Sequence, residues 1–430
     1  MKGSPNVAER LKARLKQRVA EFLNNGNANG STFTPLHFQN LREHLRQVLK
    51  TLSLEEHRVL RISRSGEEDQ FLDDFINETL GLGPLDTLLK DPTITEIMIN
   101  GPNEIFIERN GHLQLAEARF RDVQQLMVTI ERMLGPAGLS VNESNPICDS
   151  SLPDGSRINV IIPPLVLNGP VVTIRRKLRD WDMPEYVTIG ALDQQVAEFL
   201  ERCVQAKVNI VFSGGTSTGK TTLVAILSRA IARHERVITI ENVPELELPE
   251  LPHWIRLISK APNLEGRGEV ALRLLVKNAL RMRPDRIILG EARGGEALDV
   301  VQAMHSGHDG FMTVLHANSP AAALERLQML MQMSGLDIPS DACRIQIASA
   351  VDLVVHMARF VDGSRRIASI AQVMGSTEHG FALEDLFVFE AKEFSPEGQL
   401  QGACRYTGVK PKFLKKFLLN NVPLPSWVIT

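Results

Sequence analysis

One short segment constrains the fold of this chain more than any other part of its 430 residues. It matches the phosphate-binding pattern G-x-x-x-x-G-K-[ST], and its residues are Gly214, Gly215, Thr216, Ser217, Thr218, Gly219, Lys220, Thr221 and Thr222. The apolar run 208–212 before it has the length of a buried strand, and the run 223–231 after it predicts a helix with one apolar face. This order of strand, glycine-rich turn and helix predicts a phosphate loop (P-loop) in an α/β fold.

The chemistry of this turn follows from its residue types. Glycines let the backbone N–H groups turn inward around a β-phosphate, and the following helix points its positive dipole end at the same anion. Lys220 supplies a point charge for the β- and γ-phosphates, and the hydroxyl of Thr221 can bind Mg²⁺. The alternative is a glycine-rich turn that binds nothing, and the order of strand, loop, lysine and helix disfavours it. We therefore predict that the chain binds a nucleoside triphosphate.

Composition limits the remaining classes of protein. The length predicts two or three domains rather than one core. A net charge of −3 gives no sign of a general nucleic-acid binder. The four cysteines are scattered without a C-x-x-C pair, which argues against a zinc module or a disulfide framework and favours a reducing cytoplasm. No apolar run approaches the roughly 20 residues that cross a bilayer, and we see no secretory signal, so we expect any membrane association to come through partner proteins.

Changes in residue composition and in the spacing of apolar residues divide the chain into segments. Residues 2–23 have apolar side chains at helical spacing and a local charge of +4, which predicts a basic amphipathic helix. Such a helix could lie on anionic lipid, dock to a partner or remain solvated, and these alternatives stay open. The run 24–31 predicts a flexible linker. We expect six segments in chain order. They are a basic helix with its linker (1–35), a helical region (36–90), an α+β domain (91–180), a connector (181–189), a nucleotide-binding core (190–375) and a C-terminal extension (376–430).

Short β-like runs and helical runs follow each other in both main domains. In the α+β domain we expect strands at 94–99, 105–108, 113–115, 157–162 and 171–175, and a helix capped by Asp122. In the core we expect strands at 208–212, 237–240, 255–258, 286–289 and 311–315, with a helix over 269–282 and others after the strands. Their alternation predicts a mainly parallel sheet covered by helices. The last fifty or so residues have mixed patterns.

Acidic residues follow two of the predicted core strands. Glu291 ends the strand 286–289 at the edge where open α/β sheets bind ligands, while Gly290 stands where many P-loop enzymes carry an Asp. Glu291 is therefore the main candidate for the Mg²⁺–water and catalytic role, with an exposed strand-end Glu as the alternative. Glu241 and Glu245 follow the strand 237–240 and could reach a shared water beside the γ-phosphate. As isolated features they would be surface charges.

Basic side chains gather in the same part of the chain. Arg267 lies between two glycines, and a cation is needed for the charge that develops on the γ-phosphate. Three more arginines precede the acidic strand and three histidines flank the last core strand: Arg281, Arg283, Arg286, His305, His308 and His316. The spacing of His305 and His308 allows a metal site, but without nearby cysteines we favour hydrogen bonding or nucleotide sensing.

These motifs resemble those of the secretion ATPases of the type II/type IV superfamily, and most of all the CpaF-type motors of Tad pili. The resemblance rests on the P-loop, the Asp-box segment 240–246, the segment 263–269, the Walker-B stretch 278–297 and the His-box 307–319. Upstream, 99–102, 154–159 and 173–176 resemble the family's N-terminal domain, and 408–413 resembles the CpaF-type tail. The resemblance covers about residues 85–375.

The resemblance implies a RecA-like P-loop NTPase core preceded by an α+β (PAS-like) N-terminal domain and a helical N-terminal extension. It also implies a homo-oligomeric ring, usually a hexamer, that binds ATP and Mg²⁺ between the N-terminal domain and the core. Arginines of the N-terminal domain reach the phosphates in such rings, and Arg157, Arg175 and Arg176 are our candidates.

The family further implies a cytoplasmic ATPase that drives pilus assembly or secretion at inner-membrane platform proteins, with no transmembrane segment of its own. In this interpretation Lys220 binds the phosphates, Thr221 binds Mg²⁺, and Glu291 positions the metal through water. Of the remaining candidates, Glu241 and Glu245 would polarise the water. His316 would contact the γ-phosphate, and Arg267 would stabilise charge in the transition state.

Two departures from the family pattern keep other functions open. Asn242 stands where the Asp box usually carries a second acid, and Pro244 stiffens the same loop. The tetracysteine module of some type II relatives is absent from the sequence, so we expect no zinc. The alternatives are an ATPase for conjugation or effector export, a pilus-retraction motor, and a nucleotide-binding scaffold with little hydrolysis, which the Asn242 departure supports best.

Overall fold

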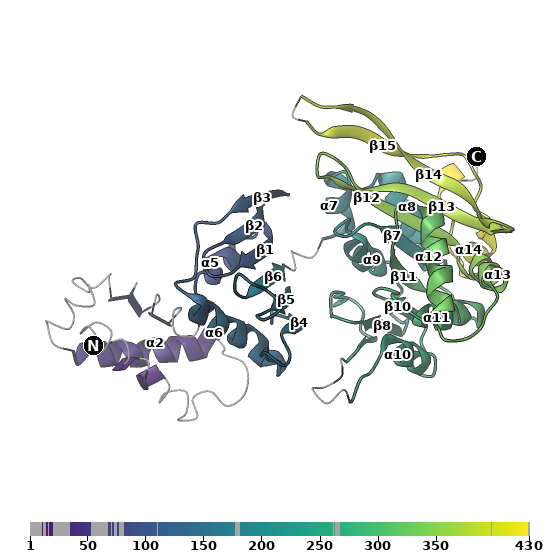
Figure 1. Cartoon of the computed structure of the whole chain (residues 1–430). Helices are drawn as coiled ribbons and strands as arrows, with labels where there is room; N and C mark the ends of the chain where they lie inside the picture. Colours follow the sequence, from purple (N-terminus) through teal and green to yellow (C-terminus); the bar gives the residue numbers. More distant parts are fainter. Residues whose placement is uncertain are drawn as a thin grey trace. The chain divides into compact units, whose positions relative to one another are not determined.

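The computed structural model describes residues 35–52, 81–109, 111–176, 181–260, 262, 267–396 and 398–428, and single positions between 11 and 19 and between 68 and 76. The predicted linker at 24–31, Asn110 between two predicted strands and the segment 263–266 lie outside the described residues. The chain divides into two compact units, 1–178 and 179–430 (Figure 1). No helix in the described part of the chain is both long and apolar enough to span a bilayer.

The first unit contains a six-stranded antiparallel sheet in the order β3-β2-β1-β6-β5-β4. Its strands are β1 (Ile94–Asn100), β2 (Ile105–Arg109), β3 (His112–Leu115), β4 (Ile147–Ser151), β5 (Arg157–Ile161) and β6 (Val171–Arg175). All were predicted except β4, whose residues alternate poorly and bury only Cys148. Alternate apolar residues of β1, β2, β5 and β6 form one core with the helices α5 (Leu85–Lys90) and α6 (Val123–Leu134), whereas β3 is exposed along its length.

Helix boundaries in this unit follow local hydrogen bonding. The Asp122 carboxylate accepts a hydrogen bond from the Gln125 backbone N–H at 2.7 Å, which confirms the predicted cap of α6. The 3₁₀ turn η2 (Gly135–Ala137) ends that helix, as its Gly-Pro pair predicts. Farther upstream, Leu41, Leu45 and Leu49 form the buried face of α2 (Pro35–Lys50), because residues four apart lie on one side of a helix.

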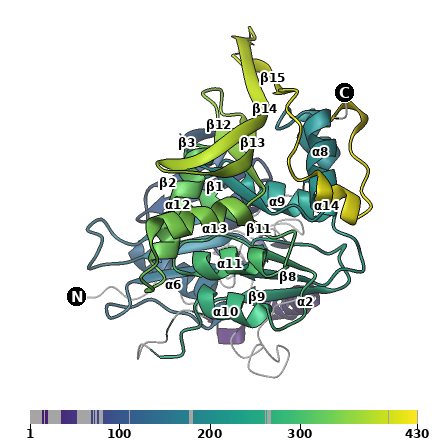
Figure 2. The ribbon, with the colours of Figure 1, turned by 90° about the vertical axis from the view of Figure 1, so that its right-hand side faces the viewer.

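The second unit is built on a nine-stranded sheet in the order β15-β14-β13-β12-β7-β11-β10-β8-β9 (Figures 1 and 2). The run from β12 to β9 in this order is parallel. Its strands are β7 (Ile210–Gly214), β8 (Val237–Glu241), β9 (Trp254–Ile258), β10 (Arg286–Leu289), β11 (Met312–His316) and β12 (Leu353–Arg359). This confirms the predicted parallel core, and the chain has the α/β fold of a P-loop NTPase.

Helices cover both faces of this sheet and form two separate cores. One core contains α7 (Met183–Thr188), α8 (Gln194–Gln205), α9 (Lys220–Ser228) and α14 (Leu414–Leu419). The other contains α10 (Leu272–Ala279), α11 (Glu296–His305), α12 (Pro320–Gln332) and α13 (Ser340–Ala350). The predicted helix over 269–282 is shorter than expected, because the backbone of Val270 pairs with Lys260 and keeps the chain before Leu272 extended.

The part of the chain with mixed patterns extends the same sheet. Three antiparallel strands, β13 (Arg365–Thr377), β14 (Gly380–Phe394) and β15 (Leu400–Tyr406), continue it beyond β12. Register shifts within β13 and β14 break the regular alternation of apolar and polar residues, so the period-2 signal of a strand is weak there. The expected end of the core at residue 375 falls inside β13. The 3₁₀ turn η3 (Ser426–Val428) packs its aromatic residue beside Phe387.

A buried ion pair stabilises the edge of this sheet at which the strands begin. The Arg286 Nε donates to Glu235 Oε2 at 2.7 Å, and the Lys207 Nζ lies 3.3 Å from the same oxygen. Burial disfavours the charged carboxylate, but the two cations outweigh it and lower the pKa of Glu235. An added Cβ at Gly310 would lie 2.1 Å from the Arg286 Nη1, so a glycine is required there. Arg286, one of the arginines near the acidic strand, is therefore structural.

Replacing Arg286 with Met is expected to lower the free energy of unfolding of the second unit by about 3 kcal/mol, because Glu235 stays buried and keeps only Lys207 as a partner. Urea denaturation followed by tryptophan fluorescence measures this unit alone, since all three tryptophans lie in it. Arg405→Met is the control, because its ion pair with Glu390 is exposed and should contribute less than about 1 kcal/mol. Equal losses in the two variants would contradict the prediction.

Candidate nucleotide-binding site

The P-loop joins the carboxyl end of β7 to the first turn of α9, as predicted. Gly214 and Gly219 have φ angles of +150° and +95°, which side chains with a Cβ rarely adopt. An added Cβ at Gly214 would lie 2.3 Å from the Met357 carbonyl oxygen of β12, and one at Gly219 would lie 2.9 Å from the Tyr186 hydroxyl. Glycine is therefore required at both ends of the loop, and a different neighbouring atom excludes a side chain at each end.

Lys220 lies inside the curve of the loop. Its side chain is buried, and its Nζ donates hydrogen bonds to the carbonyl oxygens of Gly214 at 3.0 Å and Gly215 at 2.5 Å. The ammonium group is thus held at the centre of the turn by loop carbonyls. Thr221 and Thr222 follow in the first turn of α9 and are half-buried. This arrangement places one cation and the start of a helix at the position predicted to bind phosphate.

Glu291, His316 and Arg293 form one ionic cluster at the same edge of the sheet. The Glu291 Oε1 lies 3.3 Å from the His316 Nε2, and its Oε2 accepts a hydrogen bond from the Arg293 guanidinium at 2.7 Å. His316 ends β11 and pairs in register with Gly214 of β7. Burial, and then the charge of Lys220, lower the pKa of His316, so the neutral imidazole is favoured. The structure therefore brings three predicted residues together, namely Lys220, Glu291 and His316.

Glu241 is buried at the end of β8, next to Gly290 of the neighbouring strand end. Its Oε1 accepts hydrogen bonds from the backbone N–H groups of Glu245 and Leu246, both at 3.0 Å. Its Oε2 has no hydrogen-bond partner among the described residues. An added Cβ at Gly290 would lie 3.0 Å from the Glu241 Cγ, so the glycine in place of an Asp leaves room for this side chain. Burial raises the pKa of Glu241 to about 7.

The rest of the Asp-box segment acts mainly through its backbone. Glu245 is half-buried, and its N–H holds Glu241. Asn242 is exposed and accepts a hydrogen bond from the Ser259 hydroxyl at 2.7 Å, so it ties the end of β8 to the end of β9. In this segment Glu241 is therefore the buried acid, and Asn242 links two loops.

The candidate arginines lie in different parts of the chain. Arg157 and Arg175 are paired neighbours on β5 and β6 of the first unit. Arg176 follows β6 and donates to the Asp91 carbonyl oxygen, and also to that of Ile94 at 3.4 Å. Arg267 is exposed in the second unit. Their roles toward a phosphate remain predictions.

The three candidate histidines around the last core strand separate into two groups. His316 belongs to the ionic cluster with Glu291. His305 ends α11, and its Nε2 lies 2.8 Å from the Gln346 carbonyl oxygen of α13. The His308 Nδ1 lies 3.1 Å from the Ser306 hydroxyl. Both His305 and His308 thus lie within hydrogen-bonding distance of an oxygen atom, and hydrogen bonding was one of the roles that we favoured over a metal site.

Two residues beside the P-loop carry no motif and were missed in the sequence. Tyr186 of α7 forms a hydrogen bond with Thr222, and burial raises its pKa to about 12. His356 of β12 is buried with its Nδ1 2.9 Å from the Ser213 hydroxyl, directly before the loop. Burial, followed by repulsion from Lys220, lowers the pKa of His356. Only the tertiary structure could find them, because their sequence neighbours are ordinary helix and strand residues.

The raised pKa of Glu241 predicts a pH-dependent stability. A carboxyl with an ordinary value of 4.5 that rises to about 7 on folding keeps its proton in the folded state between these values. The free energy of unfolding should then fall by about 1.4 kcal/mol per pH unit over this window, and by about 3 kcal/mol in total, and stay level above it.

Glu241→Gln removes this titration, so the variant should gain stability relative to the parent as the pH rises from 4.5 to 7. Urea denaturation at intervals across that range measures the difference. Glu390→Gln, at an exposed position, controls for the loss of one charge. A constant difference between Glu241→Gln and the parent at all pH values would refute the assignment.

The comparisons with known proteins agree with this geometry. Residues 78–391 match the family described as type II/IV secretion system protein. The type IV secretion system protein VirB11 of Brucella suis is 33% identical over 332 residues, which cover 70% of this chain and 92% of VirB11. A Mycobacterium tuberculosis protein named provisionally as a conjugal transfer protein is 33% identical over 301 residues, or 68% of this chain and 85% of the relative.

A solved structure supports the same fold. The X-ray structure of the Yersinia pseudotuberculosis ATPase DotB has a TM-score of 0.50 and 17% identity, and the match covers 67% of this chain and 78% of DotB. The family match spans most of both units, including the P-loop and the two acidic strand ends. The chain belongs to the type II/IV secretion system protein family.

Proposed function

We propose that this chain hydrolyses ATP and that the energy released drives pilus assembly or secretion. The main support is one arrangement at the carboxyl ends of neighbouring parallel strands. It consists of a buried lysine, a Glu–His pair and a buried carboxylate with one oxygen that has no hydrogen-bond partner among the described residues. Open α/β sheets bind ligands at this edge. Phosphoryl transfer depends on positioning and charge stabilisation, and these groups supply both.

In the proposed site the P-loop holds the phosphates. The backbone N–H groups of the loop and the Lys220 ammonium contact the β- and γ-phosphates, as the position of Lys220 within the turn favours. The Thr221 hydroxyl and the Glu291 carboxylate offer oxygen ligands of the kind that Mg²⁺ prefers. Mg²⁺, when bound, would neutralise phosphate charge. Both Glu291 oxygens already contact cationic or polar groups, which suits contact with the metal through water.

The remaining residues act on water and on developing charge. The free Oε2 of Glu241 can accept a proton from the attacking water, and a pKa of about 7 is well matched to a general base at neutral pH. Glu245 supports Glu241 through its backbone N–H. His316, neutral and beside Lys220, has one N–H, which can donate a hydrogen bond to the γ-phosphate in place of Glu291. Arg267, Arg157, Arg175 and Arg176 are the proposed cations for transition-state charge, and such a cation contributes about 10³–10⁵ in rate where it is best characterised.

The proposed working form is a homo-oligomeric ring, a hexamer as its resemblance to the family implies, at the cytoplasmic side of the inner membrane and bound to platform proteins. Assembly of a Tad-type pilus is the proposed task, supported by the motifs at 240–246 and 307–319 and the tail at 408–413. Conjugation or effector export is the second candidate, since the relatives in the comparisons are named for conjugal transfer and type IV secretion. Adjoining prepilin genes would favour the first, and genes of a conjugation channel the second.

Lys220→Ala should lower ATP turnover at least about a thousandfold, because it removes the buried cation beside the phosphates. Steady-state release of phosphate measures the rate, and circular dichroism confirms the fold. Lys392→Ala, at an exposed lysine of β14, is the matched control and should leave the rate unchanged. Parental turnover in Lys220→Ala would refute the site. A parent that binds ATP and releases no phosphate would instead support a regulatory scaffold.

Gly290→Ala tests the role of Glu241 without touching its carboxylate. The new Cβ would lie 3.0 Å from the Glu241 Cγ and displace the side chain by a few tenths of an ångström. We expect kcat to fall roughly tenfold to a hundredfold while the affinity for ATP is retained. Gly375→Ala is the control, since nothing lies within 4 Å of its added Cβ. An unchanged kcat in Gly290→Ala would argue against Glu241 as the base.

A further inference from the structure

The short helix α14 near the end of the chain is attached to the second unit by one face. Phe413 and Phe417 on that face are buried in the core that also contains α8 and α9. The Asn420 side chain donates to the Ala206 carbonyl oxygen at the end of α8, at 3.1 Å. The helix therefore has a defined inner side.

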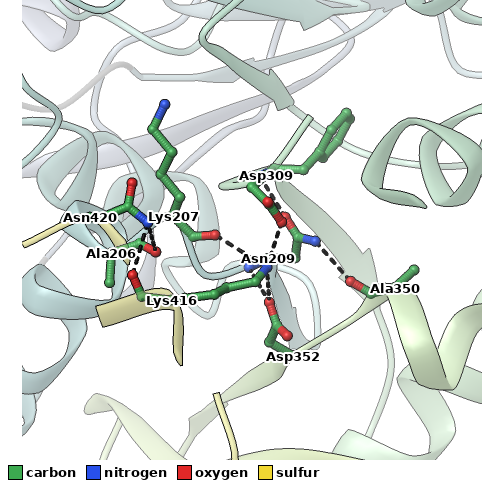
Figure 3. A network of polar contacts seen from close by, with 9 residues as sticks. Ala206, Lys207, Asn209, Asp309, Ala350, Asp352, Lys416 and Asn420 are labelled. Carbon is green, nitrogen blue, oxygen red and sulfur yellow. Dashed lines mark hydrogen bonds and ion pairs between the residues drawn. The ribbon is translucent and has the colours of Figure 1, made fainter. Parts of the chain in front are cut away.

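Lys416, on the same inner side, fixes the helix to the edge of the sheet opposite the P-loop (Figure 3). Its Nζ lies 2.6 Å from Asp309 Oδ1 and 2.7 Å from Asp352 Oδ2. The same Asp352 oxygen accepts a hydrogen bond from the Asn209 backbone N–H at the start of β7. Since Asp309 precedes β11 and Asp352 precedes β12, one lysine joins α14 to the beginnings of three strands. Its single positive charge faces two carboxylates, so the three groups together carry a net charge of −1.

The outer face of α14 is apolar and basic. Lys415, Leu418 and Leu419 are three and four residues apart, so they share one side of the helix, opposite Phe413 and Phe417. The two leucines are 80% and 71% exposed. Two adjacent leucines on a folded surface, on a helix whose other face is fixed, form a small apolar projection rather than a groove.

The chain segment that carries this projection is basic, although Asp309 and Asp352 of other elements lie beside Lys416. From Gly398 to Thr430 the sequence has five basic side chains and no Asp or Glu, although the whole chain has a net charge of −3. Lys416 is paired with aspartates and Arg405 with Glu390. Lys410, Lys412 and Lys415 are exposed, and none of the three forms an ion pair with a carboxylate in the described part of the chain. Lys410 and Lys415 are thus available to an anionic partner, and Lys412, which is attracted by Asp352 without forming an ion pair, adds a third positive charge.

We propose that this tail face, consisting of Lys410, Lys412, Lys415, Leu418 and Leu419, docks directly on an anionic phospholipid bilayer. Near such a surface each lysine contributes about 1 kcal/mol, and apolar side chains on the outer face of a helix enter the boundary between headgroups and acyl chains. Projecting leucines suit a soft lipid interface, whereas a folded acidic partner would need a complementary pocket. The contact is weak for one chain and would add up when several copies face the same membrane. It does not depend on nucleotide hydrolysis.

The test places a reporter on the tail face itself, so that lipid binding by other parts of the chain cannot hide the result. All four natural cysteines are buried, and Leu418→Cys therefore gives one exposed thiol for an environment-sensitive fluorophore. With the full-length protein, vesicles of phosphatidylcholine and phosphatidylglycerol should shift the emission to the blue, and vesicles of phosphatidylcholine alone should not. Lys410→Glu, Lys412→Glu and Lys415→Glu combined should weaken the response at least about tenfold.

Two controls make the result decisive. The same fluorophore at Leu336→Cys, an exposed leucine elsewhere in the second unit, should not respond to either kind of vesicle. Reversal of three other exposed lysines, Lys90, Lys260 and Lys392, should leave the response at position 418 unchanged. Absence of a blue shift with anionic vesicles would overturn the proposal, and so would equal responses at positions 336 and 418. ATP turnover measured in parallel keeps this outcome separate from the proposed ATPase activity.

Discussion

The position of β7 within the nine-stranded sheet is the constraint on which the rest of the second unit depends. The strand is fully buried between β11 and β12. Its last residue, Gly214, faces His316 on one side and Met357 on the other. The P-loop therefore leaves the sheet with backbone on both sides, and only a glycine fits. The same pairing brings His316 to the loop, which no spacing in the sequence could specify.

The two ends of the parallel strands in this sheet carry different kinds of charged group. At the edge where strands end, burial and charge perturb titratable groups, raising the pKa of Glu241 and lowering that of His316. At the edge where strands begin, ions are paired, with a buried pair of Arg286 and Glu235 and a partly exposed contact of Lys416 with two aspartates. Such pairs fix strands in place, whereas perturbed groups are typical of functional sites. The separation explains why an arginine close to the acidic strand in sequence belongs to the structural edge.

Much of the fold could be predicted because the signals were local. The P-loop, the Asp122 cap and most parallel strands depend on residues that are neighbours in the chain. The C-terminal strands could not, because register shifts in β13 and β14 remove the alternation that identifies a strand. In the candidate site Lys220, Glu241 and Glu291 were predicted from motif and position. Tyr186 and His356 were not, since they reach the loop only through folding.

The sequence by itself determined that a glycine-rich turn with a lysine follows a buried strand, and that acids follow two others. The tertiary structure decided which of those acids is buried and which oxygen is free. The physical reason is that burial and hydrogen bonding are set by neighbouring strands. Gly290 of one strand end makes room for Glu241 of another, and the turn after β8 satisfies just one of its oxygens. The sequence thus specifies the chemical type of each group, and the packing of the folded chain determines its protonation state and its hydrogen-bond partners.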